Sequence, residues 1–178
     1  MAAAGEAQDP DWTGFVKPLE LPEGFEAPRR LVHDELVGRA LSRHDLAADL
    51  AAVNSSVEII GATRGGDWPE GPVSEDDDFV DLVWHEHEHR ENLSFAYAVY
   101  ERDRDYVGCC YLYPLGRRTP LSHGVLAHDV DISWWVTGAA HARGCYETVY
   151  RALRTWAVRD FPFSAPHCSN IVVPDPAA

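Results

Sequence analysis

The segment that decides the fold runs from residue 131 to residue 158. It reads DISWWV over 131–136, TGAAHARG over 137–144 and CYETVYRALRTWAV over 145–158. The first part is rich in β-branched and aromatic residues, which is typical of a buried strand. The last part carries apolar side chains at helical spacing, namely Tyr146, Val149, Tyr150, Leu153, Trp156 and Ala157. Since a further extended segment is predicted at 163–173, the order of elements predicts a βαβ unit.

Upstream of this unit, hydrophobic periodicity predicts three strands, at 36–41, 94–100 and 106–113, and two helices, at 42–53 and 74–92. Ser74 is the predicted N-cap of the second helix, because the acidic residues Glu75, Asp76 and Asp77 fill the turn that follows it. We expect Phe79, Leu82 and Val83 to face the core from this helix. Residues 63–73 are rich in glycine and proline and are predicted to form a loop.

Residues 1–30 contain several prolines and aromatic side chains, which predict an extended N-terminal arm rather than a helix. Residues 31–178 are predicted to form a single domain, since the whole chain has only 178 residues. The predicted fold class is α/β of the α+β type. We expect a mixed, mostly antiparallel sheet of about five strands flanked by about three helices.

The charge of the chain limits its partners. Fifteen Lys and Arg residues stand against 29 Asp and Glu residues, which gives a formal net charge of −14. Nucleic acid and anionic membrane surfaces are therefore not expected as partners. The acidity suits either a cationic partner or simple solubility.

The sequence predicts a cytoplasmic protein. No apolar run is long enough for a membrane span, and residues 1–11 do not have the pattern of a signal peptide. The four cysteines form no C-x-x-C pair and are interpreted as reduced, packed thiols: Cys109, Cys110, Cys145 and Cys168.

The segment 131–158 resembles the core of the GNAT-type N-acetyltransferase superfamily, and the predicted element order from Leu36 to Val173 fits that family. The resemblance implies acetyl-CoA as cosubstrate and no metal. It also implies that the strand residues Trp134, Trp135 and Val136 offer backbone groups to the pantetheine arm. In this family the loop motif Gln/Arg-x-x-Gly-x-Gly/Ala wraps the pyrophosphate, because glycines allow a close approach and free N–H groups bind phosphate.

The loop of this chain follows that motif in part. If Gly144 occupies the first glycine position, His141 stands at the Gln/Arg position and Tyr146 at the final Gly/Ala position. Tyr146 can also be an ordinary core aromatic, and Asn170, after the last strand, can be an ordinary turn residue. The resemblance implies a second set of cofactor-binding residues: His141, Arg143, Gly144, Cys145, Tyr146 and Asn170.

The predicted elements stop before the last helix and two strands that are usual in the family. Those elements contribute to the acceptor site in other members, so the N-terminal arm or a second subunit could replace them here. A homodimer is consistent with the exposed sheet edge that this pattern leaves.

The resemblance also implies direct transfer of an acetyl group to an amine. Asp131, at the start of the central strand, is the candidate catalytic base, whereas the alternative is a solvated or hydrogen-bonded carboxylate at a strand end. The expected acceptor is a small-molecule or peptidic amine, and the acidic charge would suit a cationic one. Asp67 and Trp68 lie in the loop where the family places acceptor-side residues. The alternative function is a catalytically inactive GNAT-fold protein that binds acyl-CoA or a protein partner.

A second motif points to different chemistry. Residues 85–89 read HEHEH and match H-E-x-x-H, in which two histidines on one helix face bind zinc and the glutamate acts as base. The third ligand is missing from the expected positions, which hold Asn92 and Phe95. The alternative is the solvated polar face of an amphipathic helix, opposite the apolar face assigned above.

Overall fold

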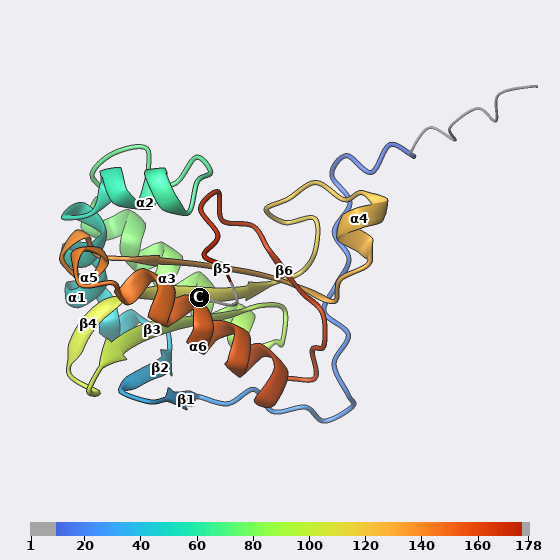
Figure 1. Ribbon diagram of the computed structural model, residues 1–178, viewed down its shortest axis with the longest axis horizontal. Helices are drawn as coiled ribbons and strands as arrows, with labels where there is room; N and C mark the ends of the chain where they lie inside the picture. The colour runs from blue at the N-terminus through green and yellow to red at the C-terminus, as the bar shows by residue number, and fades with distance from the viewer. Residues whose placement is uncertain (1–9, 176–178) are drawn as a thin grey trace, which may run out of the picture.

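The computed structural model describes residues 10–175 and contains a six-stranded sheet with the order β1-β2-β3-β4-β5-β6 (Figure 1). The strands are β1 Arg30–His33, β2 Leu36–Ala40, β3 Phe95–Glu101, β4 Asp105–Tyr113, β5 Val130–Val136 and β6 Pro166–Cys168. Neighbouring strands are antiparallel except β5 and β6, which are parallel. The predicted sheet type and the βαβ unit are therefore confirmed.

The sheet has six strands rather than about five. The additional strand, β1, lies at the end of the predicted arm and pairs with β2, with Arg30 opposite Arg39. Pro28 precedes it, which is compatible with an edge strand because an edge does not need every N–H as a donor. Residues 1–9 of the predicted arm lie outside the described residues.

Helices cover both faces of the sheet. On one face lies α6 (Cys145–Arg159), and on the other lie α1 (Leu46–Asn54), α2 (Val57–Thr63) and α3 (Glu75–Arg90) (Figure 1). Successive residues of β5 point to opposite faces, so Trp134 packs against α6 while Trp135 joins the core of the other face. Both indole rings are fully buried.

The helix ends follow their sequence signals. The side chain of Ser74 caps α3 by accepting from the N–H of Asp77, and Ser42 forms a capping box with Asp45. The predicted helix 42–53 begins with a 3-10 turn, Arg43–Asp45, before α1. Three short helices were not predicted, namely α2, α4 (His123–Leu126) and α5 (Gly138–Ala142).

The prediction of the buried face of α3 was wrong in part. Leu82 is buried, but Phe79 is 41% exposed, and the buried side chains also include Asp78, His85, Glu88 and His89. The polar residues are buried because other elements provide contacts for them. Glu88 accepts hydrogen bonds from Ser94 and Arg117. The histidine and glutamate face of this helix is therefore packed rather than solvated.

Within residues 10–175, none of the helices has the length and apolar character that crossing a membrane would require.

Candidate functional site

The connection between β5 and α6 is the predicted pyrophosphate loop. The structure folds residues 138–142 into α5, with Thr137 as its N-cap, where an irregular loop was expected. Gly144 follows with φ of 80°, a left-handed conformation that suits glycine, and α6 begins at Cys145. In the described part of the chain no side chain caps α6, so the N–H groups of its first turn are available to an anion.

The two basic residues of the loop, His141 and Arg143, each contact a residue of the first turn of α6. The ring of His141 packs against that of Tyr146, with centroids 5.6 Å apart. Arg143 is exposed and forms an ion pair of 3.3 Å with Glu101, at the end of β3. The loop thus brings its predicted residues together around the start of α6, but Arg143 already has a carboxylate partner.

Of the other predicted cofactor residues, Trp134 and Asn170 meet at the edge of β5 that faces β6. Beyond Cys168 the chain continues, and the side chain of Asn170 binds the backbone of Trp134 twice. Its Oδ1 accepts from the N–H of Trp134 at 3.2 Å, and its Nδ2 donates to the carbonyl of Trp134 at 2.9 Å. On the other edge of β5, Trp134, Trp135 and Val136 lie opposite Cys110, Cys109 and Gly108 of β4. Asn170 therefore occupies both the N–H and the carbonyl of Trp134 on the edge of β5 that faces β6.

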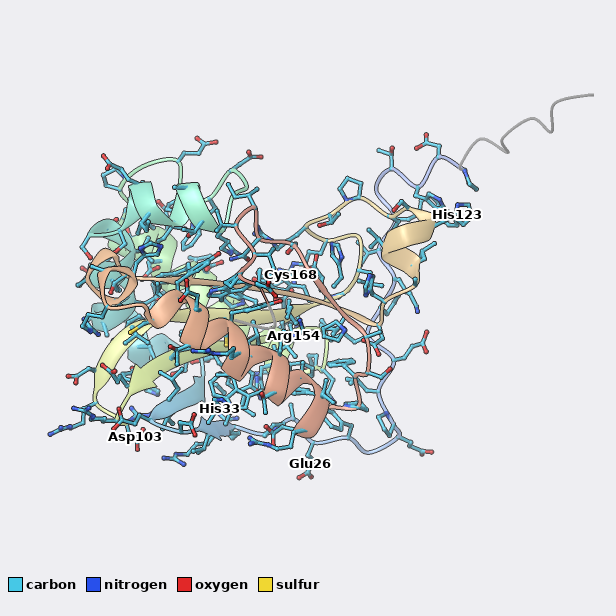
Figure 2. All side chains as sticks on the ribbon, in the orientation of Figure 1. Glu26, His33, Asp103, His123, Arg154 and Cys168 are labelled. Carbon is cyan, nitrogen blue, oxygen red and sulfur yellow. The ribbon has the colours of Figure 1, made fainter. Side chains whose placement is uncertain are left out.

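Tyr146 helps to hold the same C-terminal segment in place. Its hydroxyl donates to the carbonyl of Val172 at 2.7 Å and accepts from Asn170 Nδ2 at 2.7 Å. The N–H of Val172 donates to the carbonyl of Thr63, at the end of α2. Figure 1 shows this segment, in red, passing beside α2. In Figure 2, Cys168 lies near the centre of the molecule, while His123 lies at the end formed by α4.

These residues fit acetyl-CoA at one end of its expected path and not at the other. The uncapped start of α6 offers the donors that a pyrophosphate requires. By contrast, Asn170 occupies the Trp134 backbone groups that the resemblance assigns to pantetheine. Binding in the implied manner requires Asn170 to leave Trp134.

A cavity of about 390 Å³ lies on the α2–α3 side of the sheet. Its lining comes from the loop after α2, from α3, from β4 and from the loop after β4: Arg64, Asp67, Trp68, Asp81, His85, Tyr111, Tyr113, Arg117 and Arg118. Asp67 and Trp68 were expected near the acceptor. The others were not predicted, since only the register of β4 and the packing of α3 bring them together.

Asp131 lies in the sheet beside this cavity. It is opposite Tyr113 in the β4–β5 register, so both side chains lie on the same face. The Asp131 side chain is fully buried, and among residues 10–175 neither carboxylate oxygen has a hydrogen-bond partner in good geometry. Burial raises its pKa to about 6, although the nearby side chain of Ser169 and then the positive charges of Arg118 and Arg64 oppose the shift. A buried, unpartnered carboxylate with such a pKa is a candidate proton acceptor.

His85 lines the same cavity and belongs to the H-E-x-x-H motif. Its ring lies 3.4 Å from Asp81 and 3.7 Å from Glu88. Burial lowers the pKa of His85, but these two carboxylates outweigh it and the net shift is upward. Glu86, the base of the zinc hypothesis, is instead paired with Arg43. Among residues 10–175, no group of three His, Cys, Asp or Glu side chains is placed to hold a metal ion.

Comparison with solved structures identifies the architecture. RimL, the ribosomal L7/L12 alpha-N-protein acetyltransferase, in complex with coenzyme A, matches with a TM-score of 0.56 and 16% identity, covering 72% of this chain and 66% of that one. A protein from Bordetella pertussis described as a GNAT-family acetyltransferase also matches, with a TM-score of 0.51 and 18% identity, covering 71% of each chain. The fold is that of the GNAT-type N-acetyltransferases.

Two further GNAT-fold structures agree. The ribosomal-protein-S5-alanine acetyltransferase from Vibrio fischeri has a TM-score of 0.54 and 10% identity, and the match covers 73% of this chain and 67% of that one. The SpeG spermidine N-acetyltransferase chimera from Vibrio cholerae and hSSAT has a TM-score of 0.51 and 15% identity, with coverage of 76% and 70%. The chain spans about two thirds of the length of these proteins. No family model and no curated protein matches it.

Proposed function

We propose that this protein is an acetyl-CoA-dependent N-acetyltransferase that acts on a small amine. The observation that carries the proposal is the position of Asp131, which is buried and unpartnered beside the cavity, on the strand that GNAT-type enzymes place against acetyl-CoA. The GNAT-type fold and the uncapped start of α6 support the choice of cosubstrate.

In the proposed reaction, acetyl-CoA supplies a thioester, and the acceptor nitrogen attacks its carbonyl carbon. A C–N bond forms and the C–S bond breaks, which leaves an amide and a thiolate. Asp131 takes the proton from the amine, and the thiolate takes up that proton to become free CoA, which restores the Asp131 carboxylate. Since the pKa of Asp131 is about 6, its carboxylate is the dominant form above that pH.

The remaining site assignments follow the resemblance. His141, Arg143, Gly144, Cys145 and Tyr146 would surround the pyrophosphate at the start of α6. Trp134, Trp135, Val136 and Asn170 would line the pantetheine. The four cysteines are free, which supports the proposed cytoplasmic location.

One observation favours a second candidate function. Asn170 occupies the Trp134 N–H and carbonyl that the resemblance assigns to pantetheine. The second candidate is therefore a GNAT-fold protein that binds acyl-CoA or a protein partner and transfers no acetyl group. The two candidates differ in whether CoA is released as free thiol, since the inactive protein can bind acyl-CoA or a protein partner.

Two measurements test the proposal. Calorimetry with acetyl-CoA should give saturable binding, and a thiol-detection assay over a panel of primary amines should show CoA release that depends on one class of amine. Absence of heat at high micromolar acetyl-CoA would remove the transferase. Binding without thiol release for any amine would leave the inactive binder in its place.

A further inference from the structure

Arg64 is an unusual residue in the wall of the cavity. It follows α2 and is only 5% exposed. Its guanidinium lies 4.7 Å from the ring centroid of Tyr111 and 5.9 Å from that of Trp68. Within residues 10–175, the Arg64 side chain forms no hydrogen bond or ion pair, and its Nε is buried without a partner. A guanidinium has five N–H donors, so contacts with ring faces alone leave its hydrogen-bonding capacity unused.

Arg118 lies beside Arg64 and shares the same cavity. Its Nε donates to Ser169 Oγ at 3.1 Å, and its Nη2 donates to the carbonyls of Arg64 and Gly65, each at 3.2 Å. These partners are neutral. Burial lowers the pKa of Arg118, and the positive charge of Arg64 lowers it further. Two guanidinium groups thus face one cavity without a carboxylate bound to either.

The other charged groups of the cavity wall have partners or stand apart. Arg117 is paired with Glu88 at 2.7 Å, and Asp81 lies 3.4 Å from His85. Asp67 is exposed. Asp131 is the carboxylate whose charge both arginines sense, but no ion pair within 4.0 Å joins it to them in the described part of the chain. The wall therefore places positive charge at Arg64 and Arg118, and the buried carboxylate of Asp131 lies behind the wall, opposite Tyr113 in the sheet.

We propose that Arg64 and Arg118 form a carboxylate subsite, so that the acceptor is an amine that also carries a carboxylate, as a free amino acid does. The inference rests on the proposed function for the ligand's role as acceptor. A carboxylate accepts two parallel N–H bonds from a guanidinium, which would satisfy the unused donors of Arg64. The amino group of the same molecule would then be free to approach Asp131.

The size and lining of the cavity agree with this class of ligand. A volume of about 390 Å³ is at the lower end of the range for small-molecule sites. The rings of Trp68, Tyr111 and Tyr113 provide an apolar wall for a side chain. The sequence suggested a cationic acceptor. In the proposed ligand only the amino group is cationic, and the carboxylate adds a negative charge.

Calorimetry without any acetyl donor tests the subsite directly. The probes are the common L-amino acids at millimolar concentration, each compared with its C-terminal amide, against wild type, Arg64→Met and Arg64→Lys. We expect at least one amino acid to bind at least about tenfold more tightly than its amide, a difference of about 1.4 kcal/mol. Arg64→Met should remove this preference, Arg64→Lys should keep part of it, and Arg104→Met, an exposed arginine in the β3–β4 turn, should leave it unchanged.

Circular dichroism and thermal unfolding establish whether each variant is folded. If Arg64→Met does not fold, the comparison of wild type with Arg64→Lys still tests the subsite. The subsite is refuted if acids and amides bind alike, if no amino acid binds, or if the preference survives both Arg64 variants. Because this calorimetry contains no acetyl donor, tighter binding of amino acids than of their amides would support the subsite even if no amine caused thiol release in the transferase assay. Failure of the transferase and failure of the subsite are therefore distinguishable.

Discussion

The two faces of the sheet use buried residues differently. The α6 face is built from aromatic and aliphatic side chains, and the ring of Trp134 packs against those of Tyr146 and Tyr150. The α1–α3 face buries several charged groups, among them Asp49, Asp78 and Asp131. Because an unpaired buried carboxylate is costly, such groups persist where they serve chemistry or share protons. The face with α6 thus has an apolar core, whereas the opposite face buries the carboxylates and is the one on which we propose the reaction takes place.

The largest effect should follow from weakening the α6 face. Leu153 of α6 is fully buried in the aromatic core, and Leu153→Ala leaves a cavity there. We expect a loss of about 2–5 kcal/mol in the free energy of unfolding, measured by urea denaturation. Val158→Ala, on the exposed side of the same helix, is the control and should change it by less than about 0.5 kcal/mol. Equal effects of the two variants would contradict the packing described.

On the opposite face, removing the proposed base should affect catalysis rather than folding. Asp131→Asn keeps the shape but cannot accept the proton, so kcat should fall by about 100-fold or more. In wild type, activity should rise as the pH passes through about 6, because the carboxylate forms there. A thiol-release assay across pH measures both effects. Asp105→Asn, at an exposed position, is the control; if Asp131→Asn retained most of kcat, another group would be the base.

The same face should also contain a pH-dependent contribution to stability. Burial, followed by the neighbouring charge of Asp49, raises the pKa of Asp78 to about 7. The folded state therefore binds this proton more tightly than the unfolded state, so stability falls as the pH rises from about 4 to 7. Asp78→Asn provides an amide donor toward Asp49 and removes this loss. We expect a gain of about 1–2 kcal/mol at pH 8.

Urea denaturation at pH 5 and pH 8 measures this effect, with Asp76→Asn as the control, since Asp76 is an exposed acidic residue in the same helical turn. A wild-type protein with equal stability at both pH values would show that Asp78 ionises normally.

The smallest effect concerns the edge of β5, between the two faces. Asn170→Ala frees the N–H and carbonyl of Trp134. If Asn170 competes with pantetheine for these groups, acetyl-CoA should bind about tenfold more tightly in calorimetry. Weaker binding would instead mean that Asn170 itself holds the pantetheine, as the resemblance to GNAT-type enzymes implies. Ser169→Ala, one residue earlier, controls for general loosening of the segment.

The sequence predicted the elements whose signals are local. The strands β2 to β5, the Ser74 cap and α6 follow from periodicity and capping. α2 was missed because Gly61 and the glycines after it resemble a loop. β1 was missed because four residues beyond a proline are too few for a clear alternation, and β2 supplies its partner.

The site was less predictable than the fold. Asp131 was identified through the resemblance, and its burial is consistent with a special role. Arg64 and Arg118 lie 54 residues apart, and their proximity depends on how the loop after α2 meets the loop after β4. The buried face of α3 was misassigned because partners for His85 and Glu88, such as Tyr111 and Arg117, come from β4 and the loop beyond it. No local pattern encodes such pairings.

The hydrogen bonds between Asn170 and Trp134 should slow the exchange of the Trp134 amide proton with solvent. A side-chain amide presents the same donor and acceptor as a peptide group, so Asn170 protects the Trp134 amide as a neighbouring strand would. That amide proton can exchange with solvent only when residues 169–172 lift from β5 and α2. Its exchange rate therefore reports the free energy of opening this edge of the sheet, and hence how readily the edge becomes available to another molecule.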